Sequence, residues 1–209
     1  RHIRHHEILN DDHVCPDTLD MGWHVWCNEF GIEIPTTYAK DAEGVVMGYH
    51  FECPIQDLNN GFEMIQPATF GVDREGTLAE KQFLEETFGD LLPVVIRSGT
   101  YGYNCLTQRL MRLMSMETFF MAMYDCPDQL HAVMALLRDN ARRQAQWAER
   151  EGLLAINNGN QCTCGTCFNF TTRLPRRPVG PGPARLTDMW SGMDSQETVG
   201  VSPELFHEF

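Results

Sequence analysis

Short apolar segments alternate with amphipathic helices along this chain, and that alternation constrains its fold more than any other feature. Residues 91–96 and 153–156 are nearly continuous apolar runs, as is typical of strands buried on both faces, and a further strand is expected at 186–190. The order strand, polar loop, helix predicts a parallel sheet built from βα units. The predicted helices cover 77–88, 106–114, 116–124 and 127–151, and short strands are predicted earlier at 31–35 and 45–51.

The longest predicted helix has one apolar face. Its apolar residues, among them Leu130, Met134 and Leu137, recur at spacings of three and four, which places them on one side of a helix. Gly152 follows the last turn and favours termination there. This segment is therefore expected to supply much of the core.

The final stretch, 188–209, passes through a polar turn and starts a helix that the chain does not extend. Ser202, Pro203 and Glu204 are typical of the N-cap, the first helical position and the first turn. One helical turn is not stable by itself, because helix nucleation is costly. Together with Arg1 in the place of an initiating Met, this suggests a segment of a longer protein.

Charge and composition restrict the partners. The chain has 29 acidic and 16 basic residues, a net charge of -13, which argues against nucleic acid or an anionic membrane surface as the main partner. No apolar run approaches the roughly 20 residues of a membrane span. Eight cysteines without an export signal predict reduced thiols and a cytoplasmic location. A small-molecule substrate is the expected ligand, and a homodimer is a possible assembly.

A (β/α)8 TIM-type barrel, incomplete in this chain, is the predicted architecture. An open doubly wound sheet also fits the pattern, but no G-x-G-x-x-G motif follows a strand. Residues 1–70 are predicted to cover the barrel, and 71–209 to form its first βα units. The functional loops would follow the strands, at 97–105, 157–170 and 191–200.

Three charged residues in these loops are candidates for catalysis. Arg97 ends an apolar strand and could bind a substrate carboxylate, or form a salt bridge with an acid on a neighbouring strand. Glu197 could act as a general base and Asp194 could orient a ligand. Equally, both carboxylates could cap and brace the helix that follows.

Polar and aromatic residues in the same loops are candidates for substrate binding. Neutral amides could hydrogen-bond a ligand, although loop-forming chemistry explains them too. Aromatic rings could enclose a flat ligand or pack under a lid. The candidates are Tyr101, Tyr103, Asn160, Gln161, Gln196 and, if the N-terminal segment reaches the barrel mouth, His6.

Three cysteines form the sharpest local motif. Cys162, Cys164 and Cys167 lie within six residues, and thiolates favour tetrahedral zinc. A complete structural site usually needs a second pair of ligands, and this chain has no second C-x-x-C motif. The alternative is ordinary reduced thiols.

Several motifs together resemble the uroporphyrinogen decarboxylase superfamily. They are RHHEILNDDHVCPD (4–17), LPVVIRSG (92–99), MYDCPDQLHAVM (123–134), GLLAINNGN (152–160) and SQETVGVSPELFHEF (195–209). The resemblance implies a barrel with its active site at the C-terminal face, and a full-length protein longer than this chain. It also implies an enzyme.

Within that superfamily the sequence favours a methyltransferase. The R-Q-A-G-R-Y type motif and a match to the catalytic Asp of true decarboxylases are both absent. The resemblance then implies methyl transfer with a corrinoid (cobalamin), which a partner corrinoid protein could carry, or with a zinc-activated thiol. The alternatives are a cofactor-free decarboxylase of a porphyrinogen-like polycarboxylate, and a non-catalytic barrel that binds a corrinoid or another ligand.

Overall fold

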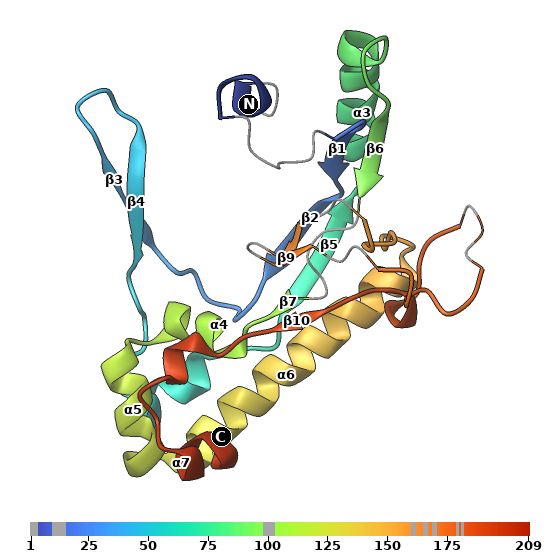
Figure 1. Cartoon of the computed structure of the whole chain (residues 1–209). Coiled ribbons are helices and arrows are strands. Elements are labelled where there is room, and N and C mark those ends of the chain that lie inside the picture. Colours follow the sequence, from blue (N-terminus) through green and yellow to red (C-terminus); the bar gives the residue numbers. More distant parts are fainter. Residues whose placement is uncertain are drawn as a thin grey trace. The chain divides into compact units, whose positions relative to one another are not determined.

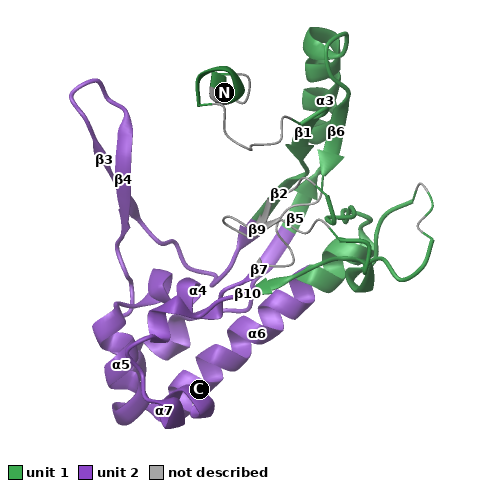
Figure 2. Ribbon diagram, in the orientation of Figure 1, with its two compact units in different colours: residues 1–26, 71–103, 145–192 green, residues 27–70, 104–144, 193–209 purple. Residues whose placement is uncertain are grey.

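The computed structural model describes residues 4–9, 16–97, 103–159, 162–164, 167–168, 171–178, 180 and 182–209. The chain forms two compact units, each built from three separate stretches of sequence (Figure 2). Unit 1 contains residues 1–26, 71–103 and 145–192, and unit 2 contains residues 27–70, 104–144 and 193–209.

Unit 1 combines short strands with one long helix, as labelled in Figure 1. Strands β1 (Leu19–Gly22) and β6 (Val94–Arg97) pair in parallel. Helix α3 (Arg74–Phe88) follows Asp73, whose carboxylate accepts a hydrogen bond from Gly76 N at 2.8 Å, as expected of an N-cap. The smaller elements are η1 (His5–Leu9), the antiparallel pair β8 (Cys162–Cys164) and β9 (Cys167–Phe168), and the 3-10 helix η3 (Leu186–Asp188).

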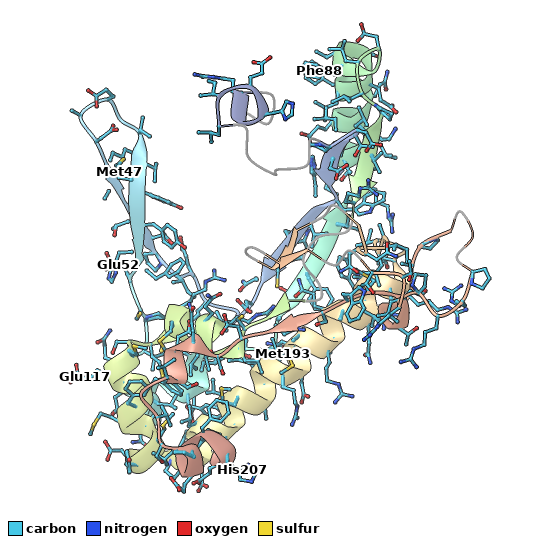
Figure 3. The ribbon with its side chains drawn as sticks, in the orientation of Figure 1. Met47, Glu52, Phe88, Glu117, Met193 and His207 are labelled. Atoms are coloured by element: carbon cyan, nitrogen blue, oxygen red, sulfur yellow. The ribbon has the colours of Figure 1, made fainter. Side chains whose placement is uncertain are left out.

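Unit 2 is mainly helical. Its helices are α2 (Leu58–Gly61), η2 (Phe62–Met64), α4 (Leu106–Leu113), α5 (Met116–Asp125), most of α6 (Pro127–Arg150), η4 (Gln196–Thr198) and α7 (Pro203–Glu208). Strands β3 (Thr36–Lys40) and β4 (Val46–Phe51) form an antiparallel hairpin that carries Met47 (Figure 3). The hairpin turn contains Gly44 at φ +84°, a conformation that favours glycine.

Four further strands carry the chain between the units. β2 (His24–Asn28) pairs with β5 (Thr69–Asp73), and β7 (Tyr103–Asn104) pairs with β10 (Gly192–Met193). Four of the five unit boundaries fall inside these strands, and the fifth, between residues 144 and 145, falls inside α6.

The core of unit 2 is large and comes mostly from its helices. On α6, Leu130, Val133 and Leu137 are fully buried, which confirms the predicted apolar face. Other fully buried members are Phe30, Ile55, Leu58, Leu110, Leu113 and Met114. Burying one such side chain contributes roughly 2 kcal/mol, so these contacts are the main source of stability in unit 2. No described helix is both long and apolar enough to cross a membrane.

The core of unit 1 is smaller. Its buried residues are Ala148, Leu153, Leu154, Ala184 and Met189, and partly buried side chains such as Trp23 and Trp147 pack around them. Gly152 ends α6 at φ +68° and turns the chain so that Leu153 and Leu154 enter this core.

The predicted barrel is wrong. In the described residues the sheets have two strands each, and no eightfold βα arrangement is present. The predicted strand at 153–156 is an extended, buried connection instead, in which Leu154 O accepts a hydrogen bond from Ala184 N (3.0 Å). Residues 186–188 form a 3-10 helix, and the predicted strand at 31–35 is also absent.

The barrel prediction failed because a short apolar run indicates that its side chains are buried, but it does not indicate that its backbone pairs with a neighbouring strand. Leu153 and Leu154 are buried as predicted, but side chains of α6, of residues 184–189 and of β2 and β5 surround them, and the described residues 153–156 form no strand. The helices were more predictable. Those found at 74–88, 106–113, 116–125 and 127–150 confirm the four predictions within a few residues.

Candidate functional site

An apolar cavity of ≈ 480 Å³ lies within unit 2. Its apolar walls come from α4, α5, α6, the segment 193–201 and α7, and its apolar lining residues are Leu106, Phe119, Met123, Met134, Met193, Val201, Leu205, Phe206 and Phe209. Figure 3 labels Met193 at the end of β10. The volume falls within the roughly 300–1,000 Å³ range of small-molecule sites. We call this space the Met/Phe cavity.

The C-terminal helix α7 forms one wall of the Met/Phe cavity. An N-cap stabilises its first turn, and its apolar face packs against the core of unit 2. The Ser202 hydroxyl accepts a hydrogen bond from Leu205 N (3.3 Å), and Pro203 occupies the first turn, as predicted from sequence. Leu205 and Phe209 then pack against the core of unit 2, and the Phe209 ring lies 4.5 Å from the His131 ring. Packing against α6 thus stabilises a helix that is too short to be stable alone.

The polar residues that line the Met/Phe cavity come from two segments, 104–107 and 194–198, which a hydrogen bond joins, and we call this part of the lining the polar end. Asn104, Thr107, Asp194, Ser195 and Thr198 line it there. The Thr107 hydroxyl donates a hydrogen bond to Glu197 Oε2 (2.7 Å), which links α4 to η4. Asp194 Oδ1 accepts a hydrogen bond from Gln196 N at 3.0 Å. Asp194 is the charged member of the described lining.

Asp194 and Thr107 place hydrogen-bond acceptors at the polar end. The Thr107 hydroxyl donates its hydrogen to Glu197, so the Thr107 oxygen can act toward a ligand in the cavity only as a hydrogen-bond acceptor. The Asp194 carboxylate accepts hydrogen bonds only. A ligand hydroxyl, amine or ammonium group can donate a hydrogen bond to either residue, whereas a ligand carboxylate beside Asp194 would meet a like charge.

The structure brings three of the predicted site residues together. Asp194, Gln196 and Glu197 lie in one short turn and helix, with Asp194 on the cavity wall and Glu197 bonded to a wall residue. The sequence missed Thr107 and Asn104. A threonine in the first turn of a helix gives no local signal, because its partner Glu197 is 90 residues away.

Arg97 belongs to unit 1, whereas Asp194, Gln196 and Glu197 belong to unit 2. Arg97 Nε is 3.3 Å from Asp20 Oδ1 on the paired strand β1, which is the salt-bridge interpretation of the two that the sequence left open. His6 is exposed in η1.

The remaining predicted residues cannot be placed in a site. Tyr101, Asn160 and Gln161 lie outside the described residues, as does the side chain of Tyr103. The backbone of Cys162, Cys164 and Cys167 forms the β8–β9 pair, with Cys164 opposite Cys167, but their side chains also lie outside what is described. Within the described part of the chain, no group of three or more His, Cys, Asp or Glu could hold a metal ion.

Comparisons with known proteins give no relative: no family model, no curated protein and no solved structure matches this chain. The resemblance to the uroporphyrinogen decarboxylase superfamily therefore stays a prediction from sequence.

Proposed function

We propose that this protein is a small-molecule methyltransferase, and that the Met/Phe cavity of unit 2 binds the methyl-bearing substrate. One observation carries the proposal. The segment 195–209, which contributes to the sequence resemblance, also forms a wall of the cavity, through Ser195, Thr198, Val201, Leu205 and Phe209 among others. A motif chosen from sequence and a cavity found in the structure thus coincide.

The lining indicates the chemistry of the substrate. Thioether side chains such as Met123 and Met134 adapt to irregular apolar shapes and pack well against aromatic rings. Phe119 and Phe206 add flat apolar surface. At the other end, Asp194 and the Thr107 oxygen accept hydrogen bonds. The proposed substrate is a small, largely apolar molecule, aromatic or aliphatic, with one hydrogen-bond donor.

The same lining favours methyl transfer over decarboxylation of a polycarboxylate. A polycarboxylate needs cationic groups in its site. The described residues that line the cavity include the Asp194 carboxylate and neither Arg nor Lys. A substrate with several carboxylates would be repelled from this end of the cavity.

A corrinoid or a zinc-activated thiol would supply the nucleophile that accepts the methyl group. The bond between the methyl carbon and the substrate's heteroatom would break, and the heteroatom would leave with the electron pair and take a proton from solvent. A corrinoid is larger than the Met/Phe cavity, so we propose that a partner corrinoid protein presents it. The described side chains offer no zinc site, and we assign no step to zinc. The chain's own contribution is to bind and orient the substrate through Asp194 and Thr107, with Glu197 holding Thr107. The cytoplasm stays the proposed location.

Methionine-methyl NMR of the full chain tests the binding step. With 4-methoxyphenol as the probe, the methyl signals of Met123, Met134 and Met193 should shift saturably, whereas Met47 on the β3–β4 hairpin should not. 4-Methoxybenzoate should bind more weakly, because its carboxylate meets Asp194. Unshifted cavity methionines with every methoxyarene tested would contradict the proposed site.

A matched pair of variants assigns the polar contact. Asp194→Asn should weaken 4-methoxyphenol binding by roughly three- to tenfold, since a hydrogen bond to a charged acceptor is exchanged for a neutral one. Asp139→Asn removes the same charge from an exposed ion pair on α6 and should leave binding unchanged. Mixing the complex with reduced cobalamin or a thiol then tests methyl transfer. Binding of the methoxyarene without methyl transfer would contradict the proposed methyltransferase activity and would indicate a ligand-binding protein.

A further inference from the structure

Unit 2 contains a second cavity, which is charged where the Met/Phe cavity is apolar. Its volume is ≈ 290 Å³. The lining residues are Cys27 of β2, Glu29 after it, Gln108, Arg109 and Arg112 of α4, and Gln144 of α6. We call it the arginine cavity. The proposed methyl transfer does not use it.

Glu29 holds two arginines at this cavity. Its Oε1 is 2.9 Å from Arg109 Nη1, and its Oε2 accepts a hydrogen bond from Arg112 Nη1 at 3.0 Å. Only 10% of the Glu29 side chain is exposed. Asn140 Nδ2, itself from a buried residue, donates to Glu29 O at 3.3 Å and helps to hold this part of the chain in place. A carboxylate paired in this way keeps both guanidinium groups fixed.

The arginines have donor capacity that Glu29 does not use. Each guanidinium carries five N–H donors, and the Glu29 contacts involve one nitrogen of each. Arg112 Nε is buried and has no hydrogen-bond partner among the described residues. The Arg112 guanidinium also lies 5.3 Å from the centre of the Phe51 ring, which orients its plane. The Arg112 side chain is 43% exposed and lines the cavity, so the N–H groups that Glu29 does not use are open to an acceptor bound there.

The charge balance identifies the class of acceptor. Two arginines and one glutamate leave an excess of one positive charge at a site within a chain of net charge -13. A singly charged anion would neutralise that excess, whereas a doubly charged phosphate would exceed it and be repelled more strongly by Glu29. We propose that the arginine cavity binds a small monocarboxylate, whose planar oxygens match the guanidinium fork. Gln108 and Gln144 supply neutral amide donors at the same wall.

Cys27 gives a direct readout of occupancy. Partial burial and the neighbouring Glu29 carboxylate raise the pKa of the Cys27 thiol, while Arg109 and Arg112 act in the opposite direction. Cys27 is nevertheless exposed, so an alkylating reagent can reach it. A bound carboxylate would cover the thiol and add a further negative charge, and both effects reduce the amount of reactive thiolate. Alkylation of Cys27 by neutral iodoacetamide, followed by peptide mass spectrometry, should therefore slow saturably as benzoate or acetate is added. Chloride keeps the ionic strength constant, and Cys53 is the internal reference.

Two variants and a control separate this site from general effects of charge. Arg112→Gln should weaken the protection by benzoate roughly tenfold, the size of one charge-assisted hydrogen bond. Arg112→Lys keeps the charge but lacks the fork, so its protection should be intermediate. Arg138→Gln removes an exposed arginine of α6 that pairs with Asp139. In this variant benzoate should protect Cys27 as strongly as in the unmodified chain. Circular dichroism checks that each variant is folded.

Three results would overturn the proposal. They are the absence of saturable protection by either carboxylate, stronger protection by inorganic phosphate than by benzoate, and equal protection in folded Arg112→Gln protein. Because these measurements report on Cys27 and not on the methionines of the Met/Phe cavity, failure here is distinguishable from failure of the proposed methyltransferase.

Discussion

The two units of this chain are stabilised in different ways. In unit 2, the apolar faces of α4, α5 and α6 meet in one large core, and both cavities lie there. In the described part of unit 1, the buried apolar cluster has five residues, and side-chain hydrogen bonds hold the surrounding loops. The difference shows that helices with regular apolar faces provide a rigid frame in which polar site residues can be placed.

Asn157 shows how unit 1 replaces regular structure with side-chain contacts. Its Nδ2 donates to Trp190 O at 2.9 Å, and its Oδ1 accepts from Trp190 N at 2.8 Å. One amide thus satisfies both backbone groups of a residue that has no strand partner. Glu149 similarly accepts a hydrogen bond from Leu186 N at 3.0 Å. Such contacts fix particular loops and bury little apolar surface.

The largest expected effect comes from the core of unit 2. Leu130→Ala deletes a fully buried side chain of α6 and should destabilise unit 2 by about 3 kcal/mol, through lost burial and the cavity left behind. All four tryptophans, Trp23, Trp26, Trp147 and Trp190, lie in unit 1. Urea unfolding followed by helix circular dichroism should therefore shift more than unfolding followed by tryptophan fluorescence. Equal shifts would break the distinction between the units.

A substitution in unit 1 is expected to have an intermediate effect on stability. Asn157→Ala leaves the backbone groups of Trp190 without partners and should cost about 2 kcal/mol, because unsatisfied buried polar groups are expensive. Tryptophan fluorescence should now report the larger shift in the urea midpoint. Asn59→Ala, at an exposed position of α2 in unit 2, is the control and should change that signal little. An unchanged midpoint in Asn157→Ala would show that the loops of unit 1 do not depend on this side chain.

The helices were predictable because their signals are local. The spacing of Leu130 and Leu137 gave the buried face of α6, and Ser202 with Pro203 gave the start of α7. The barrel was not predictable, because runs such as 153–156 specify burial without choosing a strand partner. Of the candidate site, Asp194 and Glu197 could be selected from their loop. Arg112 could not, since its partner Glu29 is 83 residues away.

The smallest expected effect is a pH dependence confined to unit 1. The pKa of Asp188 is held below its usual value by the hydrogen bond from Arg185 N and by the Arg177 guanidinium. A lowered folded-state pKa contributes stability that is present above the unfolded value, near 4, and is lost as pH falls further. Tryptophan fluorescence should show unit 1 weakening below about pH 4. Asp188→Asn should remove that part of the pH dependence, and an identical pH profile in the variant would exclude Asp188 as its source.

Hydrogen exchange with and without 4-methoxyphenol tests the central claim, that ligand binding belongs to the helical unit, most directly. The account predicts slower exchange in α5, α7 and residues 193–201, which line the Met/Phe cavity, and unchanged exchange in α3 and β6 of unit 1. Ligand-induced protection confined to unit 1, or no protection in the cavity wall at saturating ligand, would contradict it.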